Sequence, residues 1–273
     1  MSSFRAAERE EDVTLFRLYG KYLAVRLKSL MEYRASFLFL TVTQAVTAFT
    51  TLFSIRFLMD RFGPVAGFTY PQVLVCYAVS SFAFAIAECF FRGFDSFSRM
   101  IADGSFDRIL IRPRGEVFQV IASKTEFSRI GRMLAAFGIL LYALAGAGVE
   151  WTVWRVLVLI FMIAGGVAFF TGLFVIYASI CFFTLEGLEF MNIFTDGGRE
   201  MSKYPLSIYG KHVLRFFTFV LPLACAQFYP FLYLCGLRDS LLCALSPGAC
   251  FLFLIPCFLF WRLGLRHYQS TGS

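Results

Sequence analysis

Six long apolar stretches, each bounded by more polar segments, dominate the pattern along the chain. They cover Ser36–Leu58, Pro71–Phe91, Arg132–Val149, Val156–Leu185, Val213–Gly236 and Gly248–Leu263. A hydrocarbon layer about 30 Å thick is crossed by a helix of roughly 20 mostly apolar residues, so the stretches have the length of membrane spans. Their apolar residues are continuous, which favours helices over the alternating strands of a membrane barrel. We therefore expect an all-α membrane protein with six transmembrane helices.

The segment before the first apolar stretch is polar and then acquires a helical period. Its polar side holds Thr14, Arg17, Lys21, Lys28 and Glu32, and its apolar side holds Leu15, Tyr19, Tyr22, Leu30 and Tyr33. This pattern predicts an amphipathic helix that lies in the cytoplasmic membrane interface. It also fits a helix packed on another subunit. The first apolar stretch is too long for a cleaved signal peptide, so we expect it to act as an uncleaved anchor.

Composition and charge support a membrane protein and set its expected orientation. Of the 273 residues, 59% are hydrophobic and 16% are charged, and the net charge is +7. With the N-terminus inside, only Arg56, Arg61, Arg155 and Arg238 of the 25 basic residues fall outside. This bias predicts cytoplasmic termini and argues against nucleic acid as the partner. We expect a cytoplasmic segment 1–35, a membrane domain 36–263 with a cytoplasmic loop 93–130, and a cytoplasmic tail 264–273.

The chain after the fifth stretch is interrupted by prolines. Pro222, Pro230 and Pro247 lie in a mostly apolar region, and proline breaks the hydrogen-bond ladder of a helix. We therefore expect a fifth span that ends near Tyr229, followed by short re-entrant helices before the last span. The eight cysteines form no CxxC pair, and whether Cys235 and Cys243 pair across the outer loop stays open.

A stripe of hydroxyl and amide side chains follows one side of the first span. It consists of Thr43, Gln44, Thr47, Thr50 and Ser54. Such a stripe can line a translocation path, or its hydroxyls can bond to carbonyls of their own helix or to neighbouring helices. In the fourth span, Ala164, Ala168 and Gly172 recur at every fourth position, which predicts a seam of close helix packing.

One carboxylate, Glu88, lies inside an apolar stretch. Arg92 follows at the spacing at which helical side chains meet, so we expect an intramembrane ion pair. The alternative is a membrane-embedded enzyme centred on Glu88. His212 and His267 lack a metal-binding partner at helical spacing, and there is no GxxxxGK[ST] phosphate loop, so we expect no catalytic residue, metal or cofactor on this chain.

The polar segment between the second and third spans is unusual for its proline and its charges. GSFDRILIRPRGEVFQVIASKTEFSRI, from Gly104 to Ile130, predicts a short helix from Phe106 to Leu110, a stop at Pro113 and a second helix that returns to the bilayer. A short helix held below a membrane by longer ones is suited to docking a soluble partner. Its charges keep it hydrated, and its apolar residues provide an area to bury.

This segment resembles the cytoplasmic loop of ABC export permeases of the type-two superfamily, in a bacterial branch of six-span subunits. Three further passages support the resemblance: GGREMSKYPLSIYGK (Gly197–Lys211), FVLPLACAQFYP (Phe219–Pro230) and GLRHYQSTGS (Gly264–Ser273). It extends over most of the chain from about Thr14. An ion-driven secondary carrier is a further alternative, but we find no pair of matching halves of the kind that such carriers have.

The resemblance implies a permease subunit of the bacterial cell membrane that pairs with an identical or related permease over two ATPase subunits. ATP and Mg²⁺ would then be bound by the ATPases. The polar segment would be the coupling helix, with its ATPase contacts at Phe106, Asp107, Arg108, Ile109, Arg112 and Pro113. The transport direction typical of this superfamily is export, and the cargo is not disclosed by the sequence.

Overall fold

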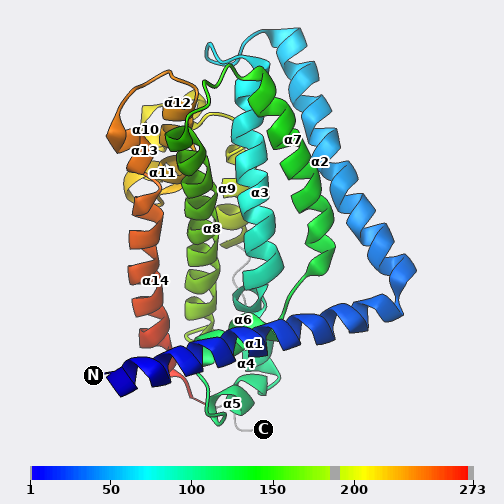
Figure 1. Cartoon of the computed structure of the whole chain (residues 1–273), viewed down its shortest axis with the longest axis vertical. Coiled ribbons are helices and arrows are strands. Elements are labelled where there is room, and N and C mark those ends of the chain that lie inside the picture. The colour runs from blue at the N-terminus through cyan, green and yellow to red at the C-terminus, as the bar shows by residue number, and fades with distance from the viewer. Residues whose placement is uncertain (1, 185–190, 270–273) are drawn as a thin grey trace.

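Five long helices packed side by side form the body of the protein (Figure 1). The computed structural model describes residues 2–184 and 191–269. The five helices are α2 (Arg34–Phe62), α3 (Tyr70–Asp95), α7 (Ile130–Gly146), α8 (Val153–Cys181) and α14 (Gly248–His267), and each belongs to a segment long and apolar enough to cross a membrane. No strand lies in the described ranges. The prediction of an all-α membrane protein is therefore confirmed.

One end of this bundle carries the short helices of the polar segment. We call it the α5 end. It holds α4 (Phe97–Ala102), α5 (Ser105–Leu110), α6 (Glu116–Ser123) and the 3₁₀ turn η1 (Phe127–Arg129), and the long helix α1 (Ser2–Glu32) lies across it (Figure 1). Tyr19 of α1 packs against Phe118 of α6, with 6.2 Å between ring centroids. The tail reaches the same end, since Tyr268 contacts the ring of Phe106.

The opposite end, which we call the α12 end, collects the proline-rich region. It contains η2 (Leu206–Tyr209), α10 (Lys211–Phe219), α11 (Leu223–Ala226), α12 (Phe228–Leu234) and α13 (Leu241–Leu245). The chain bends by 84° between α10 and the α11–α12 pair. Pro222 and Pro247 stand directly before α11 and α14, where a missing N–H is tolerated. The predicted short helices before the last span are present.

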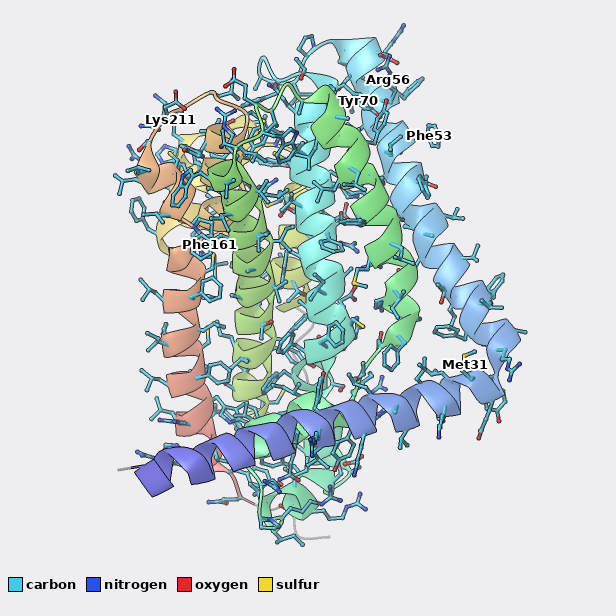
Figure 2. The ribbon with its side chains drawn as sticks, in the orientation of Figure 1. Met31, Phe53, Arg56, Tyr70, Phe161 and Lys211 are labelled. Carbon is cyan, nitrogen blue, oxygen red and sulfur yellow. The ribbon has the colours of Figure 1, made fainter. Side chains whose placement is uncertain are left out.

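The fifth crossing of the bundle differs from the expected Val213–Gly236. Phe182 lies at the α5 end, where it packs on Trp261, whereas Lys211 lies at the α12 end together with Arg56 and Tyr70 (Figure 2). The chain therefore crosses before Lys211, through α9 (Met191–Met201), and α10 to α12 stay at one end. The end of the expected fourth span, Leu185, lies outside the described residues.

The charges of α9 explain why sequence periodicity misplaced this crossing. α9 and the turn after it carry Asp196, Arg199, Glu200 and Lys203, so the segment has no long apolar window. The sequence-based count, which left only four basic residues outside, also assumed that the basic residues from Arg199 to Arg215 are cytoplasmic, and the position of Lys211 at the α12 end corrects this assumption. The segment before the first span, the loop 93–130 and the tail still gather at the α5 end, so the bias of basic residues towards this end persists.

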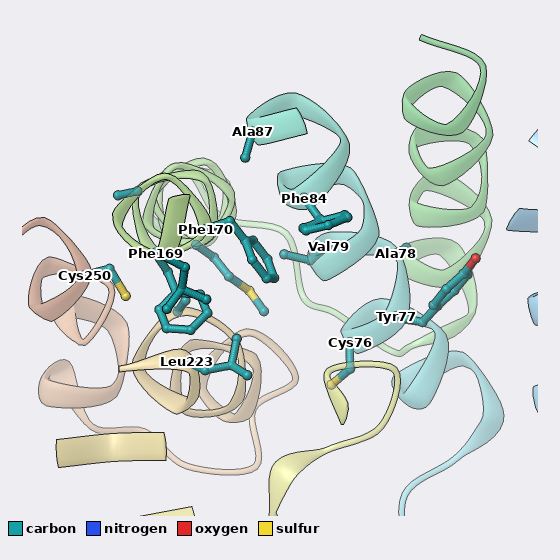
Figure 3. Packing of buried hydrophobic residues seen from close by; sticks show 14 of the residues in the cluster. Cys76, Tyr77, Ala78, Val79, Phe84, Ala87, Phe169, Phe170, Leu223 and Cys250 are labelled. Carbon is teal, nitrogen blue, oxygen red and sulfur yellow. The ribbon is translucent and has the colours of Figure 1, made fainter. Parts of the chain in front are cut away.

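Helix α8 is central and packs on α3 and α14 through small and aromatic residues. Phe84 of α3 meets Phe170 edge-on, with 4.8 Å between ring centroids (Figure 3). A Cβ added to Gly166 would lie only 2.7 Å from the Cβ of Ala83, so α3 and α8 approach as closely as glycine permits. Gly172, from the predicted seam, faces Phe253 of α14 in the same way.

Candidate functional site

Helix α5 is positioned by a left-handed glycine and a short aspartate cap. Gly104 has φ +64°, a conformation that a residue without a Cβ adopts at little cost. The carboxylate of Asp103 then accepts a hydrogen bond from the backbone N–H of Ser105 at 2.9 Å. After α5, the side chain of Gln119 donates to the carbonyl oxygens of Ile109 and Arg114 at 3.1 and 2.8 Å. The whole turn is therefore held at both ends.

The apolar face of α5 is buried in this chain. Phe106 is 0% exposed and contacts the rings of Phe97, Phe182 and Tyr268 at centroid distances of 4.8, 5.6 and 5.2 Å. Ile109 is also buried. These two residues, which we expected to contact an ATPase, face inward in this structure. They fix α5 to α4, to the end of α8 and to the chain after α14.

The outer face of α5 combines apolar and basic residues. Leu110 and Ile111 are 43% and 83% exposed, and Arg108, Arg112 and Pro113 are exposed beside them. Next to this face is a cavity of about 500 Å³ with five basic lining residues and no acidic one: Arg26, Arg99, Arg108, Arg112 and Lys124. An exposed apolar pair beside a basic hollow is suited to a protein partner with a complementary acidic surface.

Asp107, the remaining expected contact residue, accepts a hydrogen bond from the hydroxyl of Tyr268 at 2.9 Å. Burial and the neighbouring carboxylate raise the pKa of Tyr268 to about 12. The raised pKa favours the protonated phenol, which donates the hydrogen bond to Asp107. The stabilisation by this hydrogen bond is therefore present at neutral pH and is lost only above about pH 10. The contact ties the segment directly after α14 to α5.

Replacing Tyr268 with phenylalanine should loosen α5 without unfolding the protein. The ring contacts with Phe106 remain, but a hydrogen bond that contributes about 1 kcal/mol is lost. We expect faster hydrogen–deuterium exchange of the α5 amides, by about fivefold. Tyr142→Phe is the control, because Tyr142 is exposed on α7. Equal exchange rates in both variants would contradict a tethering role for the Tyr268 hydroxyl.

Glu88 lies at the centre of a buried group of charges, which we call the arginine cluster: Glu88, Arg92, Arg129 and Arg132. The carboxylate is 4% exposed. One oxygen contacts Arg92 and, at 3.5 Å, Arg129, and the other contacts Arg132 at 2.5 Å. Arg132 also donates to the amide oxygen of Gln44 at 2.5 Å. The arginine cluster therefore links α2, α3 and α7.

This geometry argues against an enzyme centred on Glu88. A general acid or base must reach the atom whose proton it transfers, and both oxygens of this buried carboxylate are already engaged by guanidinium groups. Glu88 and Arg92 are in contact, and the larger cluster includes Arg129 and Arg132. The sequence gives no signal for these two, because Arg132 is 44 residues from Glu88 and 88 from Gln44.

The hydroxyl stripe of α2 is mostly self-bonded. Thr43, Thr47, Thr50 and Ser54 each donate to the carbonyl oxygen four residues earlier, at 2.8–2.9 Å, as the alternative reading of this pattern predicts. The amide oxygen of Gln44 instead accepts a hydrogen bond from Arg132.

Cys235 and Cys243 are free thiols, and no group of metal-ligating side chains lies in the described part of the chain.

The fold defines a multi-pass α-helical membrane protein. The sequence matches the family model described as ABC-2 family transporter protein over residues 45–272. This match covers well over half of the chain, so the protein belongs to the ABC-2 transporter family. Neither a curated protein nor a solved structure matches it significantly. The chain is thus an ABC-2 type permease, a family that is not itself catalytic and generally works with ATPase subunits.

Proposed function

We propose that this permease is half of an ABC exporter of the bacterial cell membrane, driven by separate ATPase subunits that dock on α5. The observation that carries this proposal is the outer face of α5. Leu110 and Ile111 are exposed on a turn that the buried ring of Phe106 holds in place. A rigid turn of this kind can transmit movement, whereas a loosely held turn would absorb it.

In this proposal, nucleotide binding closes the ATPases and moves α5 relative to the bundle. The ATPases hold ATP and Mg²⁺, and this chain supplies the coupling contacts Arg108, Leu110, Ile111, Arg112 and Pro113. Phe106, Asp107 and Ile109 act as the internal anchor of the same turn. Both termini lie on the cytoplasmic side with α5, and the shift in access between the two sides is a population shift driven by the partner. Export is the direction that the resemblance favours.

A second permease, identical or related, would complete the path. Only 11% of the apolar window of α2 is buried within the chain, so this helix has most of its surface free for a partner subunit or lipid. We propose that its hydroxyl stripe, with Thr43, Thr47, Thr50 and Ser54, faces the translocation path. Gln44 contributes to this path indirectly, because its amide oxygen holds the guanidinium group of Arg132 in place. An aqueous path gives a polar stripe a better solvent than lipid does.

The double variant Leu110→Glu/Ile111→Glu should abolish the ATPase association. Two carboxylates would replace an exposed apolar contact, which costs an interface about 2 kcal/mol or more per anchor residue. The permease is purified from its native membrane in mild detergent, and Mg²⁺-dependent ATP hydrolysis that co-elutes with it is measured. We expect co-eluting activity with the native chain and at least a tenfold loss in the double variant.

The matched control is Val153→Glu. Val153 is exposed, lies at the first turn of α8 and is at the opposite end of the bundle, and a carboxylate is tolerated at a helix N-terminus. This variant should retain the co-eluting ATP hydrolysis. The absence of any such activity with the native chain, or equal loss in both variants, would reject docking through α5.

A further inference from the structure

A small polar cavity lies in the interior of the bundle, between α2, α3, α7 and the α9 segment. We call it the polar chamber. Its lining residues are Thr47, Ala48, Thr51, Tyr77, Ser81, Arg132, Arg199, Glu200 and Lys203. The chamber is close to the midpoint of α3, because the guanidinium carbons of Arg132 and Arg199 lie 6.0 and 5.2 Å from the ring of Phe84. Charged groups at this depth are costly, and they often mark the path of a cargo or ion.

The charges around the polar chamber favour an anionic occupant. Its lining has three basic side chains and one acidic side chain. Glu200 accepts from Arg199 at 2.9 Å and also contacts Lys203, and Arg132 is bound to Glu88. Asp196 is a more distant neighbour of Arg199, at 3.7 Å. These acids hold the cations in place, and at the lining itself basic side chains outnumber acidic ones by three to one.

One donor of a residue that lines the polar chamber lacks an acceptor. The Nε–H of Arg199 is buried and has no hydrogen-bond partner among the described atoms. A buried donor without an acceptor destabilises the folded protein, and such groups usually have a partner, a water or a ligand. An oxygen atom of a carboxylate or phosphate would accept a hydrogen bond from this N–H and would also bring a negative charge to the basic lining residues.

The size of the polar chamber limits what it can hold. Its volume is about 50 Å³, which is room for one or two waters or for a single acidic group. Thr47 lines the polar chamber and is exposed on α2, so the remainder of a larger ligand would extend towards that helix. Exposed apolar residues of α2, Val46 and Phe53 among them, offer contacts for an apolar body.

We propose that the polar chamber binds the acidic group of the transported molecule, and that the cargo is an amphiphile with a carboxylate or phosphate at one end. This inference rests on the proposed permease function and names the class of its cargo. Arg199 is the central residue, because it offers the free N–H. Lys203 supports it with a second charge.

The test uses the permease purified from its native membrane in mild detergent, with whatever subunits co-purify, and placed in lipid nanodiscs. Dodecyl phosphate and dodecanoate are the acidic probes and dodecanol is the neutral one, and their equilibrium binding is measured by calorimetry. We expect the acidic probes to bind at least tenfold more tightly than dodecanol. Arg199→Gln should remove this preference, and Arg199→Lys should restore part of it.

Two further variants keep the result interpretable. Lys203→Gln should reduce acidic-probe binding by about threefold to tenfold, and it serves if Arg199→Gln fails to fold. Arg238→Gln, at an exposed position of the α12 end, should leave binding unchanged. Equal binding of acidic and neutral probes by the native permease would overturn the inference, as would unchanged binding in both folded chamber variants, since water would then be the only occupant.

The proposed function and this inference fail in distinguishable ways. If ATP hydrolysis co-elutes with the chain and depends on Leu110 and Ile111 while acidic and neutral probes bind alike, the cargo class is wrong and the docking proposal stands. If the acidic preference depends on Arg199 but no ATPase associates, the polar chamber binds acids and the exporter proposal is wrong.

Discussion

Substituting Glu88 with glutamine should destabilise the protein by about 3–5 kcal/mol. The carboxylate is the shared partner of Arg92, Arg129 and Arg132. Arg92 and Arg129 also contact Glu126, whereas Glu88 is the carboxylate that pairs with the largely buried Arg132, so its removal leaves that guanidinium group without a counter-charge. The glutamine amide has the same shape as the carboxylate and preserves the packing. The loss in the free energy of unfolding therefore measures the effect of removing the negative charge. The measurement is the free energy of unfolding in mixed micelles, from titration with a denaturing detergent.

Asp60→Asn provides the comparison for this prediction. Asp60 pairs with Arg56 one helical turn away, and both side chains are more than half exposed, so the loss should be below about 0.5 kcal/mol. If Glu88→Gln also loses less than about 1 kcal/mol, the arginine cluster is not a structural centre. The argument against a reactive Glu88 would then lose its support.

Substituting Gly131 with alanine should separate α2 from α7. A Cβ at this position would lie 2.0 Å from the carbonyl oxygen of Thr41, where ordinary contacts begin at 3.4 Å. The obstacle is a backbone atom, so α2 must move away, and the contact between Arg132 and Gln44 lies close by. We expect a loss of about 3 kcal/mol in the free energy of unfolding, at the upper end for an overpacked site.

The control lies on the same helix. A Cβ added to Gly138 meets nothing within 4 Å, so Gly138→Ala should raise the free energy of unfolding by up to about 1 kcal/mol through the better helix propensity of alanine. Opposite signs for these two substitutions on α7 are the expected result. A small effect of Gly131→Ala would mean that α2 can shift at little cost.

The long apolar helices could be predicted from the sequence because their signal is local. Twenty apolar residues are sufficient to indicate a span, wherever their neighbours lie. The fifth crossing could not be predicted this way, because Arg199 and Lys203 make α9 polar and its stability in the bundle comes from contacts with distant residues. The arginine cluster shows the same difference between local and long-range signals. The Glu88–Arg92 spacing is visible in the sequence, whereas the contacts of Arg132 with Glu88 and Gln44 exist only after folding.

The orientation of α5 shows a related limit. Its sequence indicates a short helix with Phe106, Ile109 and Leu110 as apolar residues, but it does not reveal which of them are covered by the chain itself. Phe106 is covered because Phe182 and Tyr268, from the ends of two other segments, pack on its ring. Leu110 and Ile111 have no comparable cover, and this difference defines the surface that we propose for docking.

Helix α14 connects the two ends of the molecule mechanically. Near the α5 end, the ring of Trp261 packs against Phe97 and Phe106. Its first residues follow Pro247, which lies against Gly165 close to the helices of the α12 end. The helix is roughly 30 Å long, so a tilt at one of its ends would displace the other end. Pro256 removes one backbone hydrogen bond near its middle. A displacement of α5 would therefore tilt α14 and shift the helices at the α12 end.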